Sequence, residues 1–153
     1  MVKLDLFINE LLKARHIALD SMIFIYLLER NEKYFPSVNI IFELLEKGKI
    51  TATTSIISPL EVLSSPKLSS DQISLYRCFF KEEQNLVTHE LNWLITDFAA
   101  DIRRNYNLRT PDAIQLATAK LGDTNLFITN DEIYKKVIGA KDFPKIFLLS
   151  SIV

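Results

Sequence analysis

Four acidic residues stand at or just inside the start of a predicted helix, namely Asp20, Glu61, Asp112 and Asp131. Three of them, Asp20, Glu61 and Asp131, come shortly after a predicted strand. A group of carboxylates without histidine or cysteine is the ligand set that Mg²⁺ and Mn²⁺ prefer. A divalent cation held in this way activates a water molecule and stabilises charge on a leaving oxygen at phosphorus. Hydrolysis of a phosphodiester bond is the reaction that these residues suit best.

Each acid, taken alone, also has a purely structural interpretation. Helix capping or the helix dipole would account for Asp20, Glu61 paired with Ser58, Asp112 and Asp131. Caps alone have no reason to cluster, whereas clustered carboxylates repel one another unless a cation or shared protons compensate. The functional interpretation therefore depends on the four acids lying together.

Apolar periodicity and turn residues divide the chain into short strands and helices. Strands are expected at 16–19, 50–55, 86–88, 126–129 and 145–149. Helices are expected at about 4–12, 22–29, 36–47, 68–83, 91–106 and 110–121, with two more beginning at 58 and 130. Ser58 and Thr110, each followed by proline, are expected to cap their helices. The helix at 110–121 is rich in alanine, which suits close packing on a sheet.

Strands that alternate with helices predict an α/β fold, a three-layer doubly wound domain with a largely parallel central sheet. No repeat or linker divides the sequence, so we expect a single domain at 1–153 with an extra N-terminal helix at about 3–14. In such folds the carboxyl ends of parallel strands meet at one edge, where functional sites are placed. Asp20, Glu61 and Asp131 should meet there, and Asp112 joins them only if its helix also begins at that edge.

The composition narrows the class of protein. Apolar residues form 48% of the chain and charged residues 24%, as in ordinary globular domains. The single cysteine, Cys78, excludes an intrachain disulfide and a cysteine-based zinc cluster, and favours a cytoplasmic location. We expect neither a membrane span nor a secretion signal, because no apolar run approaches the roughly 20 residues needed to cross a bilayer. The net charge of −1 gives no sign of a large polyanion-binding surface.

Four segments resemble a known family, the PIN domains. His-Ile-Ala-Leu-Asp-Ser at 16–21 is similar to the opening motif, and Ser-Pro-Leu-Glu-Val-Leu at 58–63 is similar to the second. Residues 108–119, which include Thr-Pro-Asp-Ala and an alanine-rich helix, are typical of the VapC-like branch. Phe-Ile-Thr-Asn-Asp at 127–131 completes the pattern. In order and spacing these segments cover most of the chain from residue 16 onward.

This resemblance implies an endoribonuclease that depends on Mg²⁺ or Mn²⁺, often the toxin of a type II toxin-antitoxin pair. Such proteins are commonly homodimers and are inhibited by a segment of the antitoxin partner. Position by position, the resemblance makes Asp20, Glu61, Asp112 and Asp131 the catalytic and metal-binding residues, and it supplies the convergence of Asp112. Polar residues beside the acids would orient ligands or water, namely Ser21, Thr129 and Asn130. Arg109, three residues before Asp112, is the best candidate for a contact with RNA phosphate.

Other interpretations predict different sites. A PIN fold kept only for RNA or partner binding would retain the shape without catalysis. A receiver-type signalling module would need adjacent acids after the first strand and a lysine after the last, but Ser21 follows Asp20 and residues 150–153 contain no lysine. Asp97 and Asp101, four residues apart on a helix, would form a second metal pair only if they faced inward. Their apolar neighbours mark the opposite side as buried, so both should face solvent.

Overall fold

A computed structural model of the protein describes residues 2–153, and its five strands form one parallel sheet. The strands are β1 (His16–Leu19), β2 (Thr51–Ser55), β3 (Leu86–His89), β4 (Leu126–Thr129) and β5 (Lys145–Leu148). They lie in the order β3-β2-β1-β4-β5. Strands β2 and β3 are therefore added on one side of the central strand β1, and β4 and β5 are added on the other side. The predicted doubly wound α/β fold with a parallel sheet is confirmed.

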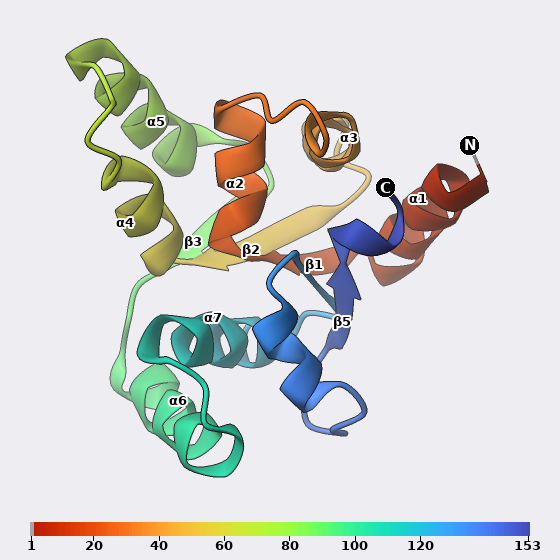
Figure 1. Ribbon diagram of the computed structural model, residues 1–153, viewed down its shortest axis with the longest axis vertical. Helices are drawn as coiled ribbons and strands as arrows, with labels where there is room; N and C mark the ends of the chain where they lie inside the picture. The colour runs from red at the N-terminus through yellow and green to blue at the C-terminus, as the bar shows by residue number, and fades with distance from the viewer. Residues whose placement is uncertain (1) are drawn as a thin grey trace.

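Helices cover both faces of this sheet, as Figure 1 shows. The α-helices are α1 (Val2–Ala14), α2 (Ser21–Leu28), α3 (Phe35–Glu46), α4 (Ile57–Leu63), α5 (Ser70–Glu82), α6 (Trp93–Tyr106) and α7 (Thr110–Leu121). Two short 3-10 helices, η1 (Glu132–Val137) and η2 (Leu149–Ser151), follow β4 and β5. In Figure 1, α2, α3 and α5 lie above the sheet, while α6 and α7 lie below it. None of the helices within residues 2–153 has the length and apolarity needed to cross a membrane.

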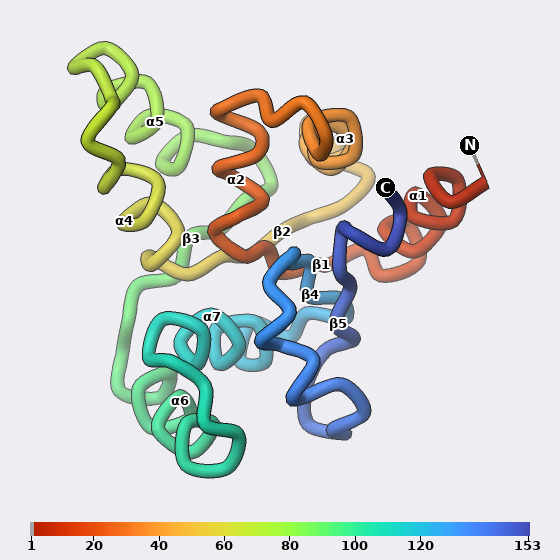
Figure 2. Tube along the Cα trace, in the orientation of Figure 1, coloured from red at the N-terminus to blue at the C-terminus, as the bar shows by residue number. Residues whose placement is uncertain are grey.

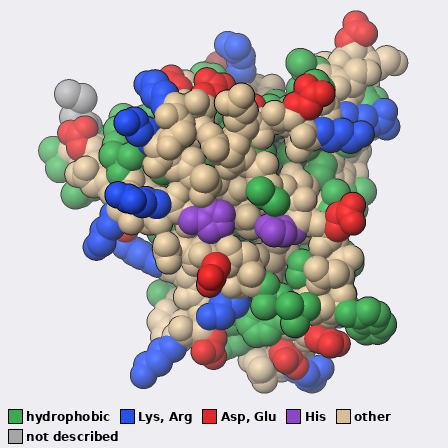
Figure 3. All heavy atoms as spheres, turned by 180° about the vertical axis from the view of Figure 1, so that it is seen from behind, with side chains coloured by type: hydrophobic (Ala, Val, Ile, Leu, Met, Phe, Trp, Pro, Cys, Tyr) green, Lys and Arg blue, Asp and Glu red, His purple; other side chains and the backbone are tan. Residues whose placement is uncertain are grey.

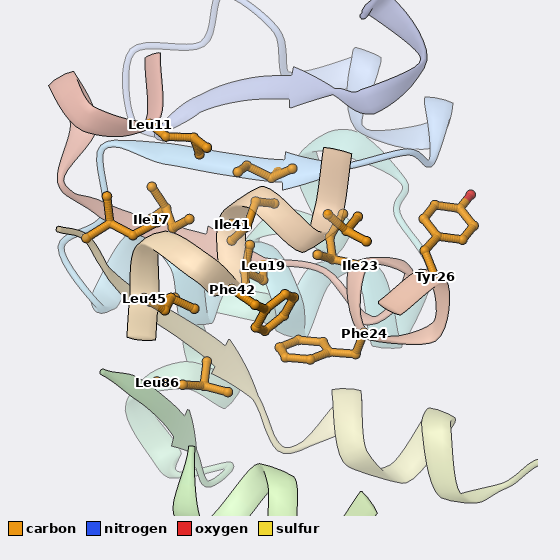
Figure 4. Packing of buried hydrophobic residues seen from close by; sticks show 14 of the residues in the cluster. Leu11, Ile17, Leu19, Ile23, Phe24, Tyr26, Ile41, Phe42, Leu45 and Leu86 are labelled. Carbon is orange, nitrogen blue, oxygen red and sulfur yellow. The ribbon is translucent and has the colours of Figure 1, made fainter. Parts of the chain in front are cut away.

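Side chains that alternate along the strands form a separate core on each face of the sheet. Ile17 and Leu19 of β1 pack with α2 and α3 in the first core, where Phe24 contacts Phe42 (Figure 4). Ala18, between them in the sequence, belongs to the second core with α6, α7 and η1. The small side chains of α7 let it lie between the sheet and α6, because every residue from 112 to 119 is buried.

The N-terminal helix α1 packs beside the last strand, β5. Figure 2 shows the two elements close together, and the Phe7 ring stacks on Phe147 with centroids 5.0 Å apart. The Nζ atom of Lys145 lies 2.7 Å from Oε2 of Glu10. Leu11 of the same helix is fully buried in the first core. The helix expected near residues 4–12 therefore covers the β5 side of the sheet.

Several helix starts differ from the sequence-based expectation. Ser58 does not cap a helix: α4 begins at Ile57, and its first N–H donates to the hydroxyl of Ser55 at 3.1 Å. Similarly, Arg109 and not Thr110 precedes α7, without a side-chain cap. The segment after Asp131 is a 3-10 helix. In both wrong assignments the hydroxyl residue lies one or two positions inside the helix, where it cannot accept from the first free N–H groups.

Candidate active site

Asp20 is held rigidly at the carboxyl end of β1. It caps α2, with Oδ1 accepting from the backbone N–H of Ser21 at 2.8 Å. The hydroxyl of Thr129, at the end of β4, donates to Oδ2 at 2.6 Å. The parallel pairing of β1 with β4 brings these two strand ends together, although they are 109 residues apart. The carboxylate is therefore fixed at both oxygens, and Asp20 is only 6% exposed.

This environment changes the acidity of Asp20. Burial raises its pKa to about 7, because the charged carboxylate loses hydration. The hydrogen bonds from Thr129 and Ser21 act in the opposite direction, whereas the negative charges of Glu61 and Asp112 raise the pKa further. Asp20 thus lies within electrostatic reach of two of the other predicted acids.

Tyr134 marks the point at which all four predicted acids come near one another. This tyrosine of η1 is fully buried, and its hydroxyl donates to the backbone carbonyl of Asp112 at 3.4 Å. Burial raises the pKa of the Tyr134 phenol well above its ordinary value, and the negative charges of Asp20, Asp112, Asp131 and Glu61 add to the effect. The structure therefore brings the four carboxylates to one region, including Asp112, whose helix α7 begins at the same edge of the sheet.

The four acids differ in exposure and in hydrogen bonding. Asp112, in the first turn of α7, is buried, whereas Glu61 on α4 is exposed. Asp131 is half-buried and caps η1, with Oδ1 accepting from the N–H of Ile133 at 2.9 Å. The structural interpretation thus holds for Asp20, Asp112 and Asp131 as a description of local geometry. Asp20 and Asp131 are caps and Asp112 is a first-turn acid, so these structural roles occur together with the clustering.

Arg109 joins two of the acids. Its Nε atom lies 2.8 Å from Oδ2 of Asp112, and its Nη2 atom lies 3.4 Å from Oδ2 of Asp131. The two carboxylates raise the pKa of Arg109, Asp112 more strongly than Asp131. With 71% of its side chain exposed, this guanidinium lies over the acids from the solvent side.

The polar residues predicted to support the acids lie in different places. Thr129 bonds Asp20 and also accepts from the backbone N–H of Asp131 at 3.0 Å, so it connects two of the acids. The Asn130 amide instead donates to the Tyr26 hydroxyl at 3.0 Å and accepts from the backbone of Ser150. No bond from Asn130 to a predicted acid occurs among the hydrogen bonds of residues 2–153.

Behind the acids lies a buried polar cluster, made of Ser21, Thr54, Ser58 and Gln115, most of which the sequence did not reveal. Gln115 Nε2 donates to the hydroxyls of Ser21 and Ser58, each at 2.9 Å. Ser58 also lies 2.7 Å from the hydroxyl of Thr54, which donates to the backbone carbonyl of Leu19. Ser21 was expected beside the acids, but Ser58 was assigned to a cap, and Gln115 has no motif of its own.

The acidic residues match the chemistry of a hard divalent cation, although they do not yet enclose one. Within residues 2–153, no three His, Cys, Asp or Glu side chains are arranged so that they could hold a metal ion as they stand. Asp112 and Asp131 share the guanidinium of Arg109 instead. All the candidate donors are carboxylate oxygens. The donor set therefore fits Mg²⁺ or Mn²⁺.

The two histidines lie apart from this chemistry. Figure 3 shows them close together on the face turned away from the viewer in Figure 1. His16 bonds the Thr51 hydroxyl at 2.7 Å and the Gly122 carbonyl at 3.0 Å, and His89 bonds Thr53 at 3.0 Å. Burial lowers the pKa of His89, and the nearby His16 lowers it further. Both rings thus serve as hydrogen-bonding residues of the sheet.

Two surface hollows, of about 610 and 570 Å³, contain none of the four acids. The first lies between α4, α5 and β3, and the second lies between α6 and α7, where it includes Thr110 and Ile114. The side-chain chemistry, and not the volume of a hollow, therefore marks the candidate site.

Comparisons with known proteins agree with the fold described above. A family model described as PIN domain matches residues 17–139. A toxin-antitoxin complex from Klebsiella pneumoniae has a similar structure, with 22% identity and a TM-score of 0.64, over 87% of this chain and 97% of that one. VapBC2 from Rickettsia felis, bound to a DNA fragment from its promoter, matches with 14% identity and a TM-score of 0.61, over 87% and 98%. VapBC-5 from Mycobacterium tuberculosis matches with 15% identity and a TM-score of 0.54, over 88% and 98%. No curated protein matches the chain.

Proposed function

This chain belongs to the PIN domain family, and from that premise we propose that it is a divalent-metal-dependent endoribonuclease. The observation that carries the proposal is the gathering of four carboxylates around Tyr134, with the pKa of Asp20 raised to about 7. Maintaining several close carboxylates costs folding free energy, and binding of a cation recovers it. Catalytic and metal-binding roles are proposed for Asp20, Glu61, Asp112 and Asp131.

Each residue has a defined part in this reaction. Asp20, Glu61, Asp112 and Asp131 would hold the cation, and the bound Mg²⁺ or Mn²⁺ lowers the pKa of water and neutralises charge on the scissile phosphate. Thr129 and the N–H of Ser21 fix both oxygens of Asp20, so that its orientation does not change between turnovers. Arg109 releases Asp112 and Asp131 and pairs with an RNA phosphate, for which its planar guanidinium is well suited.

An RNA cleavage assay tests the proposed nuclease activity. The purified protein should cut RNA with Mg²⁺ or Mn²⁺ and stop when a chelator is added. Asp20→Asn and Asp112→Asn should each remove cleavage while circular dichroism remains that of the folded protein. Asp97→Asn is the matched control, because Asp97 is exposed on α6 and should leave the rate unchanged. Equal cleavage by Asp20→Asn and the unmodified protein, with contaminating nuclease excluded, would refute the proposal.

We further propose that the protein is the toxin of a type II toxin-antitoxin pair, acting in the cytoplasm as a homodimer. The support is that three similar structures are described as toxin-antitoxin complexes or members of such systems, and each covers 87% or more of this chain. Expression of this chain alone should arrest growth, and co-expression of a small protein encoded beside it should restore growth. Arrest that persists in Asp20→Asn would separate toxicity from catalysis and contradict this proposal.

A further inference from the structure

Gln115 connects three helices, and one of the proposed metal ligands lies within or directly before each of them. Its Nε2 atom donates one hydrogen bond to Ser21 at the start of α2 and another to Ser58 on α4, each 2.9 Å long. Gln115 itself lies on α7 and is only 3% exposed. An amide buried to this extent and used across two helix interfaces is costly to leave unpaired, so its contacts fix the helices relative to one another.

The three contacts lie close to the acids along the chain. Ser21 follows Asp20, and its N–H holds Oδ1 of that carboxylate. Ser58 precedes Glu61 by three residues, and Gln115 follows Asp112 by three. Residues three apart on a helix lie on neighbouring parts of one face. A shift of Gln115 therefore displaces supports that lie within one helical turn of Asp20, Glu61 and Asp112.

The directions of the hydrogen bonds leave one orientation for the amide. The single proton of the Thr54 hydroxyl goes to the carbonyl of Leu19, so the Ser58 hydroxyl must donate to Thr54. Ser21 donates in turn to Ser58 at 3.3 Å. Both serine oxygens then have only acceptor positions left for residue 115, which must supply two N–H groups from one atom. Glutamine meets this need, whereas methionine of similar length does not.

We propose that Gln115 is a positioning residue that sets the spacing of Asp20, Glu61 and Asp112 and so determines the affinity for the divalent cation. This inference rests on the proposed function, because it takes those carboxylates as metal ligands. Gln115 touches neither the cation nor the RNA. Its effect passes through Ser21 and Ser58.

The test is calorimetric titration of Mn²⁺ into Gln115→Met, with thermal unfolding in chelator measured alongside. Replacing a residue that supports metal ligands typically weakens binding on the order of 10- to 100-fold, and we expect a loss in that range. Thr118→Val is the matched control. Thr118 is equally buried on α7, but its hydroxyl donates within its own helix, to Ile114. This control should lower stability somewhat and leave Mn²⁺ affinity unchanged.

A double-mutant cycle shows whether Gln115 acts through its partner. In a Ser58→Ala background, Gln115→Met should weaken Mn²⁺ binding much less than in the unmodified protein, because the contact has already been removed. Additive effects would mean that Gln115 does not act through Ser58. Should Gln115→Met not fold, the smaller changes Ser58→Ala and Ser21→Ala must each weaken Mn²⁺ binding, and normal affinity in both would overturn the proposal.

The outcomes separate this inference from the proposed function. Mn²⁺ affinity within about twofold of the unmodified protein in a folded Gln115→Met overturns the inference alone. An unmodified protein that binds Mn²⁺ but does not cut RNA contradicts the nuclease assignment, while the affinity of Gln115→Met still decides the inference. An unmodified protein that binds no divalent metal overturns both.

Discussion

Arg109 and Asp112 form an ion pair at the mouth of the acidic cluster, with Nε and Oδ2 separated by 2.8 Å. The same guanidinium reaches Asp131 at 3.4 Å. A cation bound by these carboxylates must replace the positive charge that the protein itself supplies. Arg109 would thus compete with the proposed cation for these carboxylates, and 71% of its side chain is exposed.

Removing this competitor should strengthen metal binding. We expect Arg109→Ala to bind Mn²⁺ more tightly by up to about fivefold, since exposed ion pairs contribute only about 0.2–1 kcal/mol. Binding of uncleaved RNA should weaken in the same variant, because a phosphate contact is lost. Titration calorimetry and a filter-binding assay measure the two effects. Arg109→Lys keeps the positive charge, so its Mn²⁺ affinity should remain close to that of the unmodified protein. Weaker Mn²⁺ binding by Arg109→Ala would contradict competition between Arg109 and the metal.

Asp20 should make the metal-free protein less stable as pH rises. Its folded-state pKa of about 7 lies above the ordinary value of 3.8, so the folded protein binds the proton more tightly than the unfolded chain does. The resulting stability is fully present below pH 3.8 and is lost as pH rises through 7. The difference corresponds to about 4 kcal/mol at most. Unfolding in chelator at pH 5 and pH 8 measures it.

Asp20→Asn removes this ionisation and should be more stable than the unmodified protein at pH 8, with little difference at pH 4. The Asp97→Asn control, at an exposed position, should follow the unmodified protein at both values. An Asp20→Asn variant that loses stability with rising pH as steeply as the unmodified protein would show that the loss arises from another ionisable group.

Thr129 should matter for both stability and cleavage. Thr129→Val keeps the shape of a fully buried side chain but removes the bond to Asp20 and the acceptor for the Asp131 N–H. Hydrogen bonds to charged groups contribute about 1.5–3 kcal/mol, so we expect a loss of that size at pH 8, measured by urea unfolding. RNA cleavage should fall as well. Thr129→Ser retains the hydroxyl and should keep most of the stability and most of the cleavage activity. A Thr129→Val protein of unchanged stability would disprove the role of the Thr129 hydroxyl.

The small residues of α7 should tolerate no enlargement. Ala117 is fully buried in the second core, so Ala117→Leu should lower the free energy of unfolding by about 1–3 kcal/mol through overpacking. Ala100 on α6 is exposed, and Ala100→Leu is the control with the same added volume. Urea unfolding of both variants measures the difference. Equal stability of the two would mean that α7 packs less closely than its burial indicates.

The sequence predicted the position of an acid correctly where the acid comes shortly after a strand. Asp20, Glu61 and Asp131 follow buried strands, and the parallel pairing of those strands places them at one edge. Asp112 follows no strand, so its position came only from the family resemblance. Periodicity identifies an element but not its neighbour in space, and for this reason the approach of Asp112 to Asp20 could not be inferred from local pattern alone.

The residues that sequence reasoning missed depend on contacts between distant elements. Ser58 looks like a cap because proline and an acid follow it, yet its hydroxyl turns inward to Gln115, 57 residues away. Tyr134 reads as an ordinary aromatic residue of a helix, and only the fold brings it among the acids. No local propensity encodes such partners, because they arise when α2, α4 and α7 pack together.

The order of the strands along the chain has a consequence for synthesis. The central strand β1 emerges from the ribosome well before its second neighbour, β4, which consists of residues 126–129. Until that segment appears, Asp20 lacks the hydroxyl of Thr129, which lies 109 residues later. A nascent chain therefore carries Asp20 and Glu61 without a finished active site. Because domains generally fold as units during translation, the four carboxylates cannot come together until most of this domain has been made.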